Sequence, residues 1–215
     1  MKDSNFPTKE HPQFSFFGTL MKILLASQNK HKIEEISILL KPLGYRILSL
    51  LDFPDITPPE ETGITFEENA LIKAVALHQI CGGIVVADDS GLEVDALGGL
   101  PGVRSKRYSA EETDEANNKK LLEALKNVPP NPTARFVCAV GICTPQKQHV
   151  YRSSCEGTIR QTLSGSGGFG YDPLFCPNAY PQNTMAELSQ AQKNSISHRG
   201  LAFQKLPEIL KELLS

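Results

Sequence analysis

The central stretch of the chain reads Ile84-Val85-Val86-Ala87-Asp88-Asp89-Ser90-Gly91-Leu92. Its first residues are apolar and β-branched, follow Gly82-Gly83, and predict a short buried strand. We expect this strand to end at the two acids, with Ser90-Gly91 forming a sharp turn. Adjacent carboxylates repel each other and are retained most readily where a cation offsets their charge. The stretch therefore predicts a functional site, with an ordinary acidic turn as the alternative.

Length and charge limit the class of protein. The 215 residues, 40% of them hydrophobic, suffice for one domain or a compact pair of lobes. The net charge of −2 argues against a sequence-independent binder of duplex nucleic acid, because such a protein needs a cationic excess. No apolar run approaches the ~20 residues that cross a bilayer. We therefore expect neither a nucleic-acid partner nor a membrane partner.

The cysteines indicate a reducing compartment. They form no C-x-x-C pair and no zinc-ligand spacing, and they lie mainly in apolar segments: Cys81, Cys138, Cys143, Cys155 and Cys176. Five is an odd number, and buried free thiols are the simplest interpretation. The sequence therefore predicts a cytoplasmic protein.

Strand and helix patterns alternate along most of the chain. Residues 1–20 lack periodicity and predict a poorly ordered extension, whereas 21–215 predict the functional domain. The expected strands are 22–26, 46–50, 84–86 and a hairpin of 134–143 with 148–154, the second arm continuing over 155–163. The expected helices start near residue 30, cover 66–81, run over 109–128 with a cap at Ser109, and close the chain over 201–214.

The segment Ser27-Gln28-Asn29-Lys30-His31-Lys32 lies where the first strand passes into a helix. Such a junction offers free backbone N–H groups and the positive end of the helix dipole, which suit a phosphate group. The lysines add positive charge. A simple Ser or Asn helix cap followed by surface lysines is the alternative.

A second acidic pair, Glu60-Glu61, precedes the predicted helix 66–81. It is either a metal ligand or a solvated acidic helix start that complements the dipole. Asn69 and Lys73 are four residues apart and therefore share one face of that helix, directed into a site or into water.

Two segments near the C-terminus suit a planar base. Residues 164–173 combine four glycines with Phe169, Tyr171 and Asp172, and glycine is costly in chain entropy unless the backbone must approach something closely. A base can stack on either ring, and Asp172 can accept from ring N–H groups; a flexible surface loop is the alternative. Further on, Lys193, His198 and Arg199 form a cationic rim at a helix start.

Six motifs, in order, resemble those of the inosine triphosphate pyrophosphatase family. They are Ser27-x-Asn29-x-x-Lys32, Glu61-Thr62-Gly63-x-Thr65-Phe66-x-Glu68-Asn69-Ala70, Ala87-Asp88-Asp89-Ser90-Gly91-Leu92, Gly98-Gly99-x-Pro101-Gly102-Val103, Gly167-Gly168-Phe169-Gly170-Tyr171-Asp172-Pro173 and Ser197-His198-Arg199. The resemblance runs from Met21 to the C-terminus. Gln28 and Ser166 depart from the commoner residues of the family, which bears only on substrate ranking.

The resemblance implies an α/β fold: an elongated mixed β-sheet flanked by helices, with two lobes around a central cleft, usually in a homodimer. It implies Mg²⁺-dependent hydrolysis of non-canonical purine nucleoside triphosphates, dITP, ITP or XTP, to the monophosphate and pyrophosphate. Asp89 matches the general base and a metal ligand, and Glu61 a further metal ligand. Substrate-binding residues are expected at Ser27, Gln28, Asn29, Lys30, His31, Lys32, Lys73, Ser90, Phe169, Gly170, Tyr171, Asp172, Lys193, His198 and Arg199.

Base selection is expected to depend on the purine 6-position. A 6-keto oxygen accepts a hydrogen bond from His198 or Arg199, whereas the 6-amino group of adenine presents a second donor. Two alternatives stay open on the sequence. One is a pyrophosphatase for other modified or pyrimidine triphosphates on the same scaffold, and the other is a nucleotide-binding regulator without turnover.

Overall fold

The computed structural model describes residues 21–215, so the extension predicted at 1–20 lies outside the described residues. The strands are β1 Met21–Leu25, β2 Tyr45–Ser49, β3 Val85–Val94, β4 Thr133–Cys143, β5 Gln148–Ile159 and β6 Phe175–Pro177. The α-helices are α1 Lys30–Leu40, α2 Phe66–Cys81, α3 Asp114–Ala124, α4 Gln190–Ile196 and α5 His198–Leu214. A 3₁₀ segment, η4, covers Gly102–Arg107.

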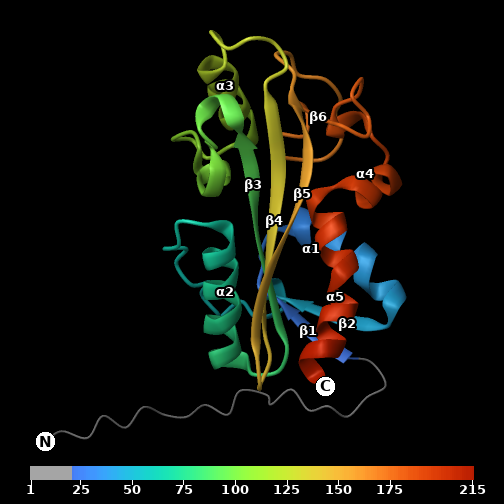
Figure 1. The fold of residues 1–215 in the computed structure, drawn as a ribbon. Coiled ribbons are helices and arrows are strands. Elements are labelled where there is room, and N and C mark those ends of the chain that lie inside the picture. Colours follow the sequence, from blue (N-terminus) through green and yellow to red (C-terminus); the bar gives the residue numbers. More distant parts are fainter. Residues whose placement is uncertain (1–20) are drawn as a thin grey trace, which may run out of the picture.

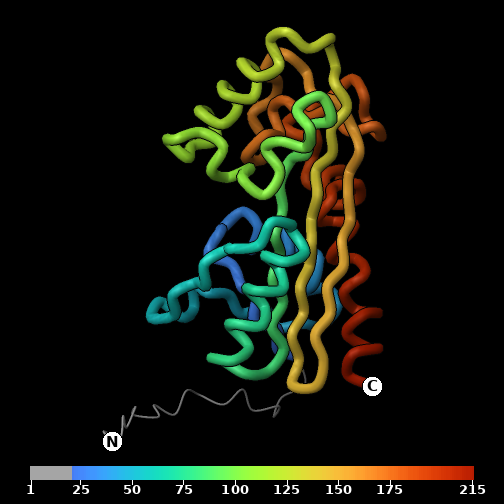
Figure 2. Tube along the Cα trace, turned by 60° about the vertical axis from the view of Figure 1, so that its left-hand side comes forward, coloured from blue at the N-terminus to red at the C-terminus, as the bar shows by residue number. Residues whose placement is uncertain are grey.

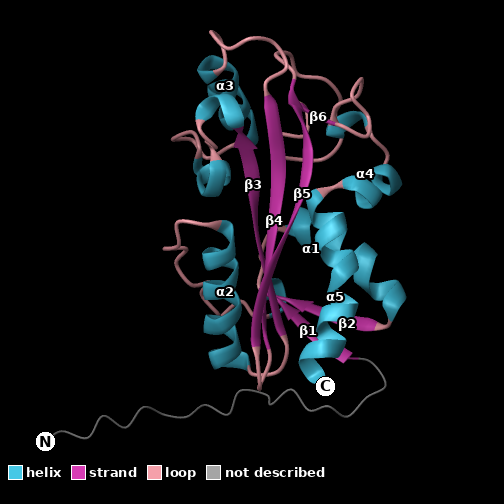
Figure 3. Cartoon of the chain, viewed as in Figure 1, coloured by secondary structure: helices cyan, strands magenta, loops and turns pink. Residues whose placement is uncertain are grey.

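One mixed sheet organises the molecule. Its strand order is β2-β1-β3-β4-β5-β6, with β1 parallel to both β2 and β3 and every later pair antiparallel. The long strands β3, β4 and β5 run along most of the molecule's length (Figures 1 and 3). This architecture confirms the expected elongated mixed sheet with flanking helices.

The long strands contribute to two separate hydrophobic cores. In the first lobe, α1 and α5 cover one face of the sheet, where Ile23, Val86 and Phe203 are buried together, and α2 covers the other face (Figure 1). In the second lobe, the far half of β3 packs with α3 and β6 around Leu92 and Phe175. Figure 2 shows the two groups of elements stacked along the same strands.

Strand β3 does not end at the acids, and the predicted turn at Ser90-Gly91 is wrong. Asp88, Asp89 and Ser90 pair in unbroken antiparallel register with β4, and the strand continues to Val94. Gly91 has another role: a Cβ there would collide with the Ser105 hydroxyl, which accepts from the amide of Leu92. The glycine therefore lets η4 approach the strand.

The long helix predicted over 109–128 is shorter. It begins at Asp114, where the Thr113 side chain caps it, and ends at Ala124. The predicted cap, Ser109, is buried, and its amide donates to Asn117 Oδ1 at 2.6 Å, while Glu112 has a positive φ of 55°. A helix cannot pass through that left-handed residue, which explains the later start.

The expectations for α2, for the closing helix and for the cysteine thiols agree with the structure. Helix α2 has the predicted bounds, and α5 starts slightly earlier than predicted, with Ser197 as its cap. All five cysteines are free thiols. Within residues 21–215, every helix is too short or too polar to cross a membrane.

Helix α2 lies very close to the sheet. A Cβ on Gly141 of β4 would lie 2.5 Å from the backbone oxygen of Ala70, well inside van der Waals contact. Because the neighbour is helix backbone, it cannot move without shifting α2 as a whole. This close approach sets the position of Asn69 and Lys73, which α2 carries.

We predict that Gly141→Ala lowers the free energy of unfolding by about 2 kcal/mol or more, because overpacked sites strain the backbone. Urea denaturation measures the change. Gln148→Ala, at an exposed position on the neighbouring strand, is the control and should stay within about 0.5 kcal/mol of the native protein. Equal stability of both variants would contradict the close-packing argument.

Candidate active site

A cavity of about 640 Å³ lies between the two lobes. The predicted site residues that line it are Ser27, Gln28, Asn29, His31, Lys32, Glu61, Lys73, Asp89, Ser90, Phe169, Gly170, Tyr171, Asp172, Lys193, His198 and Arg199. Lys30 is the exception, since it is exposed and does not line the cavity. The fold therefore brings together residues from five separate segments of the chain.

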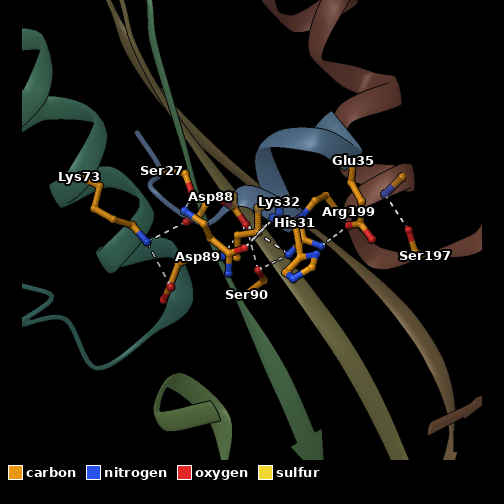
Figure 4. Close-up of polar contacts among 12 residues, drawn as sticks. Ser27, His31, Lys32, Glu35, Lys73, Asp88, Asp89, Ser90, Ser197 and Arg199 are labelled. Carbon is orange, nitrogen blue, oxygen red and sulfur yellow. Dashed lines mark hydrogen bonds and ion pairs between the residues drawn. The ribbon is translucent and has the colours of Figure 1, made fainter. Parts of the chain in front are cut away.

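The neighbouring acids of β3 point to opposite faces, as alternate residues of a strand must (Figure 4). Asp88 is directed toward α1 and α5, where Lys32 Nζ lies 2.9 Å from its Oδ2. Asp89 is directed toward α2, where Lys73 Nζ lies 3.2 Å from its Oδ1. Each acid therefore has its own lysine as the nearest cation, which agrees with the expectation that positive charge offsets the pair.

Lys73 gathers the acids on the α2 side. Its ammonium donates to Glu61 Oε1 at 3.0 Å, to Asp89 Oδ1 at 3.2 Å and to the backbone carbonyl of Asp88 at 2.7 Å. Asn69 Nδ2 donates to the other oxygen of Asp89 at 3.3 Å. Asn69 and Lys73, which the sequence placed either in a site or in water, therefore both face the site. Glu61 and Asp89 lie side by side around the Lys73 ammonium.

The two carboxyl groups on Lys73 differ in acidity. Burial raises the pKa of Asp89, and the negative charges of Glu61 and Asp88 raise it further. Lys73 lowers this pKa, but its effect does not outweigh theirs. For Glu61, burial acts in the same direction, but Lys73 and Arg107 outweigh it and lower the pKa. Asp89 is therefore the more basic of the two.

The donor set at Glu61 and Asp89 fits a magnesium ion in part. Within residues 21–215, no three His, Cys, Asp or Glu side chains lie close enough together to hold a metal by themselves. Magnesium, however, is commonly held by one or two carboxylates while substrate phosphates and water complete its octahedron. Two carboxylates that share an ammonium and a cavity wall meet that requirement.

The Asp88 side chain contacts two of the cations that line the cavity. Its side chain is fully buried, and its Oδ2 contacts Lys32 at 2.9 Å and Arg199 Nη2 at 3.5 Å, while Ser90 Oγ donates to it at 2.9 Å. Burial alone would raise the pKa of Asp88, but the cations Lys32, Arg199 and Lys73 hold it well below its ordinary value. Asp88 is therefore a permanent negative charge in the cavity wall.

Glu35 of α1 holds the cations at the other end of the cavity. Arg199 Nη1 donates to its Oε2 at 2.6 Å, and Lys193 Nζ donates to its Oε1 at 3.2 Å. Lys193 also donates to Asp172 Oδ2 at 2.8 Å. Burial opposes ionisation of Glu35, yet Arg199 and Lys193 lower its pKa. The predicted cationic rim is thus a buried network in which carboxylates balance the cations.

His198 is not part of the positive charge. Burial, reinforced by Arg199 and Lys32, lowers the pKa of its imidazole well below the ordinary value, so the ring is neutral at neutral pH. The ring stacks on Phe136, with centroids 4.9 Å apart and planes 17° from parallel. A neutral imidazole offers one donor and one acceptor, and its Nδ1 is buried without a partner.

The 27–32 segment is a side-chain cap, so the prediction of free helix N–H groups is wrong for much of it. Asn29 Oδ1 accepts from the amides of His31 and Lys32 at 3.0 and 3.2 Å, and Ser27 Oγ accepts from the Asn29 amide at 3.1 Å. The cap nevertheless orients Lys32 into the cavity. His31 stacks on Phe169, with centroids 5.2 Å apart.

The glycine-rich loop is held from several sides. Asp172 Oδ2 accepts from the Phe169 amide at 3.1 Å, and the Gly170 amide donates to Asp114 Oδ2 at 2.6 Å. Tyr171 is buried in the second core, and its hydroxyl donates to the Ser105 carbonyl at 2.8 Å. Both rings singled out in the sequence belong to residues that line the cavity, and Phe169 is the more exposed of the two.

Buried polar atoms without partners concentrate around the cavity. Among residues 21–215, such atoms are Asp88 Oδ1, Ser109 Oγ, Asn118 Oδ1, His198 Nδ1 and Arg199 Nε. Three of the five belong to residues that line the cavity. Because an unsatisfied buried polar atom is costly, their concentration indicates a place built to receive a polar ligand.

Sequence reasoning missed three groups that shape the site. Glu35 pairs with Arg199, Arg107 Nη2 lies 3.4 Å from Glu61 Oε2, and Asn118 Nδ2 donates to the Gly170 carbonyl at 2.9 Å. Glu35 follows Lys32 by three residues and therefore shares its helix face, which was an available signal. The other two contacts join segments far apart in the chain and left none.

Comparison with known proteins places the chain in a family. The Ham1 family profile matches residues 23–209. A dITP/XTP pyrophosphatase of Desulforamulus reducens is 52% identical over 196 residues, covering 90% of this chain and 97% of the relative. Among solved structures, a HAM1 protein from Coxiella burnetii has a TM-score of 0.80 at 39% identity, covering 90% of this chain and 100% of that one.

A second solved structure, nucleoside-triphosphatase / dITP/XTP pyrophosphatase from Mycobacterium abscessus, has a TM-score of 0.71 at 43% identity and covers 86% of this chain and 98% of that one. The chain belongs to the Ham1 family. This result confirms the family resemblance found in the sequence motifs.

We predict that Glu35→Gln lowers the free energy of unfolding by about 3 kcal/mol at neutral pH, because two buried cations lose their shared carboxylate. Since the pKa of Glu35 is lowered in the folded state, its stabilising effect is complete above the unfolded value of about 4.3 and disappears as the pH falls through the folded value. Urea denaturation of both proteins between pH 7 and pH 3 measures this difference in the free energy of unfolding.

The matched control is Glu34→Gln, at an exposed position next to Glu35 on α1. Its effect should be small and independent of pH. If the difference between native protein and Glu35→Gln did not shrink on acidification, the charge of Glu35 would not be the cause.

Proposed function

We propose that the protein hydrolyses non-canonical purine nucleoside triphosphates, dITP, ITP and XTP, to the monophosphate and pyrophosphate. The observation that carries the proposal is an interlobe cavity that has carboxylates at one end and cations with a half-buried aromatic ring at the other. The names of the relatives support the same substrate class. A nucleoside triphosphate matches this arrangement, with its phosphates and their metal ion at the carboxylate end and its base at the aromatic end.

The proposal assigns Mg²⁺ to Glu61 and Asp89. When bound there, the ion would neutralise phosphate oxygens and make the phosphorus a better electrophile. Lys32 and Lys73 add positive charge beside the phosphates, and the neutral polar side chains of Ser27, Gln28 and Asn29 line the same cavity. Lys30 lies outside the lining, so its contribution is limited to long-range attraction.

Asp89 is the proposed general base. Asn69 and Lys73 fix both of its oxygens, so the carboxylate is held in a defined orientation at the cavity wall. A water oxygen attacks the α-phosphorus, the water proton passes to Asp89, and the bond from that phosphorus to the bridging oxygen breaks. Pyrophosphate leaves with the bridging oxygen.

The base-reading end explains the preference for keto purines. Arg199 and Lys193 are donors, so a 6-oxygen is accepted and the 6-amino group of adenine meets another donor. The acceptors nearby, Glu35 and Asp172, are already paired with those cations. The 2-amino group of guanine must compete with those cations for the same carboxylates, whereas the 2-oxygen of xanthine adds an acceptor for the donors. Phe169 stacks on the base.

The proposal includes a homodimer in the cytoplasm without a nucleic-acid or membrane partner. The family resemblance supports the dimer. The five free thiols support the compartment, and the net charge of −2 supports the absence of a nucleic-acid partner.

A substrate panel tests the function. With Mg²⁺, the protein should release pyrophosphate from XTP and dITP at least about tenfold faster than from ATP, GTP or pyrimidine triphosphates, the ratio expected for one donor mismatch. Asp89→Asn should lower kcat by about 100-fold or more, and the exposed Asp55→Asn should leave it unchanged. Equal rates on all triphosphates, or an active Asp89→Asn, would contradict the proposal.

Arg199→Ala tests the reading of the base. We expect the ratio of kcat/KM for ITP to that for ATP to fall at least about tenfold, because one mismatched hydrogen bond discriminates by 1–3 kcal/mol, on the order of 10- to 100-fold. Arg46→Ala, at an exposed position on β2, is the control. An unchanged ratio would show that other groups select the base.

A further inference from the structure

Helix α3 binds one residue of the glycine-rich loop through both of its backbone polar groups. The Gly170 amide donates to Asp114 Oδ2 at 2.6 Å, and the Gly170 carbonyl accepts from Asn118 Nδ2 at 2.9 Å. Asp114 and Asn118 are four residues apart on α3 and therefore lie on one face of the helix. We call these two side chains the α3 clamp. The clamp fixes both peptide units that adjoin Gly170.

Asn118 is retained at a cost to stability. It is 5% exposed, and its Oδ1 is buried with no hydrogen-bond partner among residues 21–215. An unpaired buried carbonyl oxygen destabilises a fold, and an apolar side chain of the same branching would avoid that loss. The amide at this position is therefore better explained by its bond to Gly170 than by the stability of α3.

The loop needs support from outside because glycine leaves its backbone free. Gly168 and Gly170 have positive φ values of 75° and 62°, and a chain with several glycines has little intrinsic preference for one conformation. Gly170 directly follows Phe169, so rotation of the peptide unit between them moves the aromatic ring. The contacts that hold Gly170 therefore determine where the ring lies.

The position of the Phe169 ring matters because the cations at this end of the cavity lie against it. Lys193 Nζ and the guanidinium carbon of Arg199 are each 5.7 Å from the ring centroid. These cations belong to α4 and α5, whereas the clamp belongs to α3. A base that stacks on the ring and pairs with the cations requires all three helices to be in register. The clamp supplies the contribution of α3.

We propose that Asp114 and Asn118 are positioning residues that hold the Phe169 ring where it stacks on the base of the substrate. This inference rests on the proposed function. Asn118 does not line the cavity, so its effect on a ligand must pass through Gly170. Asp114 does line the cavity, but its Oδ2 is engaged by the Gly170 amide. Loss of the clamp should therefore weaken ligands that carry a base and spare those that do not.

Calorimetric titrations with two ligands test the inference. Asp114→Ala should raise the Kd for XMP about tenfold, as expected for loss of a charge-assisted hydrogen bond, and Asn118→Leu should raise it about threefold or more. The affinity for inorganic pyrophosphate with Mg²⁺, which has no base, should fall less than about twofold in either variant. With XTP as substrate, KM should rise while kcat changes less than about twofold.

Two further variants separate positioning from a general effect on α3. Asp114→Asn keeps an oxygen that accepts from the Gly170 amide, so its Kd for XMP should stay within about threefold of the native value. Glu115→Ala removes the other acidic residue of the first helical turn, which is exposed, and should leave XMP binding unchanged. Unfolding midpoints show that each variant is folded.

Three results would overturn the inference. One is native XMP affinity in both Asp114→Ala and Asn118→Leu. Another is an equal loss of pyrophosphate affinity, because the variants would then disturb the whole cavity. The third is a Glu115→Ala effect as large as that of Asp114→Ala, because the helix dipole of α3 would then be the cause. Binding of XMP needs no turnover, so a protein that binds XMP without hydrolysing XTP would contradict the proposed function alone.

Discussion

The buried carboxylate of Asp88 is the constraint on which the cleft depends. A charge in the middle of a sheet requires nearby positive charge, because an unpaired buried ion is too costly to retain. Lys32 from α1 and Arg199 from α5 supply that charge, so both helices must keep their inner faces against the same strand. Arg199 in turn requires Glu35, and Lys193 and Asp172 follow. Asp88 thus holds cations of α1, α4 and α5 at the cavity wall, either by direct contact or through Glu35.

Alternation along β3 then divides the chemistry. Because neighbouring strand residues face opposite sides, Asp88 contacts Lys32 and Arg199 on one side while Asp89 joins Lys73 and Glu61 on the other. The close contact of α2 with Gly141 keeps that second group within reach. The two halves of the site are therefore organised by neighbouring residues of one strand and share a cavity, and each acid has its own nearest lysine.

The sequence was most informative where local physics decides the structure. Helix α2 has a capping box of Thr65 and Glu68 and a steady helical pattern, and its bounds were predictable. Strand β3 was not, since Asp88 and Asp89 suggest a strand end unless distant cations are known to neutralise them. The start of α3 depends on the left-handed Glu112, which is an unusual residue in that conformation. The contact of Arg107 with Glu61 joins residues that are far apart in the sequence, so no local pattern predicts it.

The long strands also determine how the molecule can move. Strands β3, β4 and β5 pass through both lobes with continuous hydrogen bonding, and each lobe builds its core on a different half of them. Along these strands the lobes are joined by sheet and not by a flexible linker. A change in the width of the cleft must therefore bend these hydrogen-bonded strands. The strands resist bending, which restricts how far the two lobes can move toward each other.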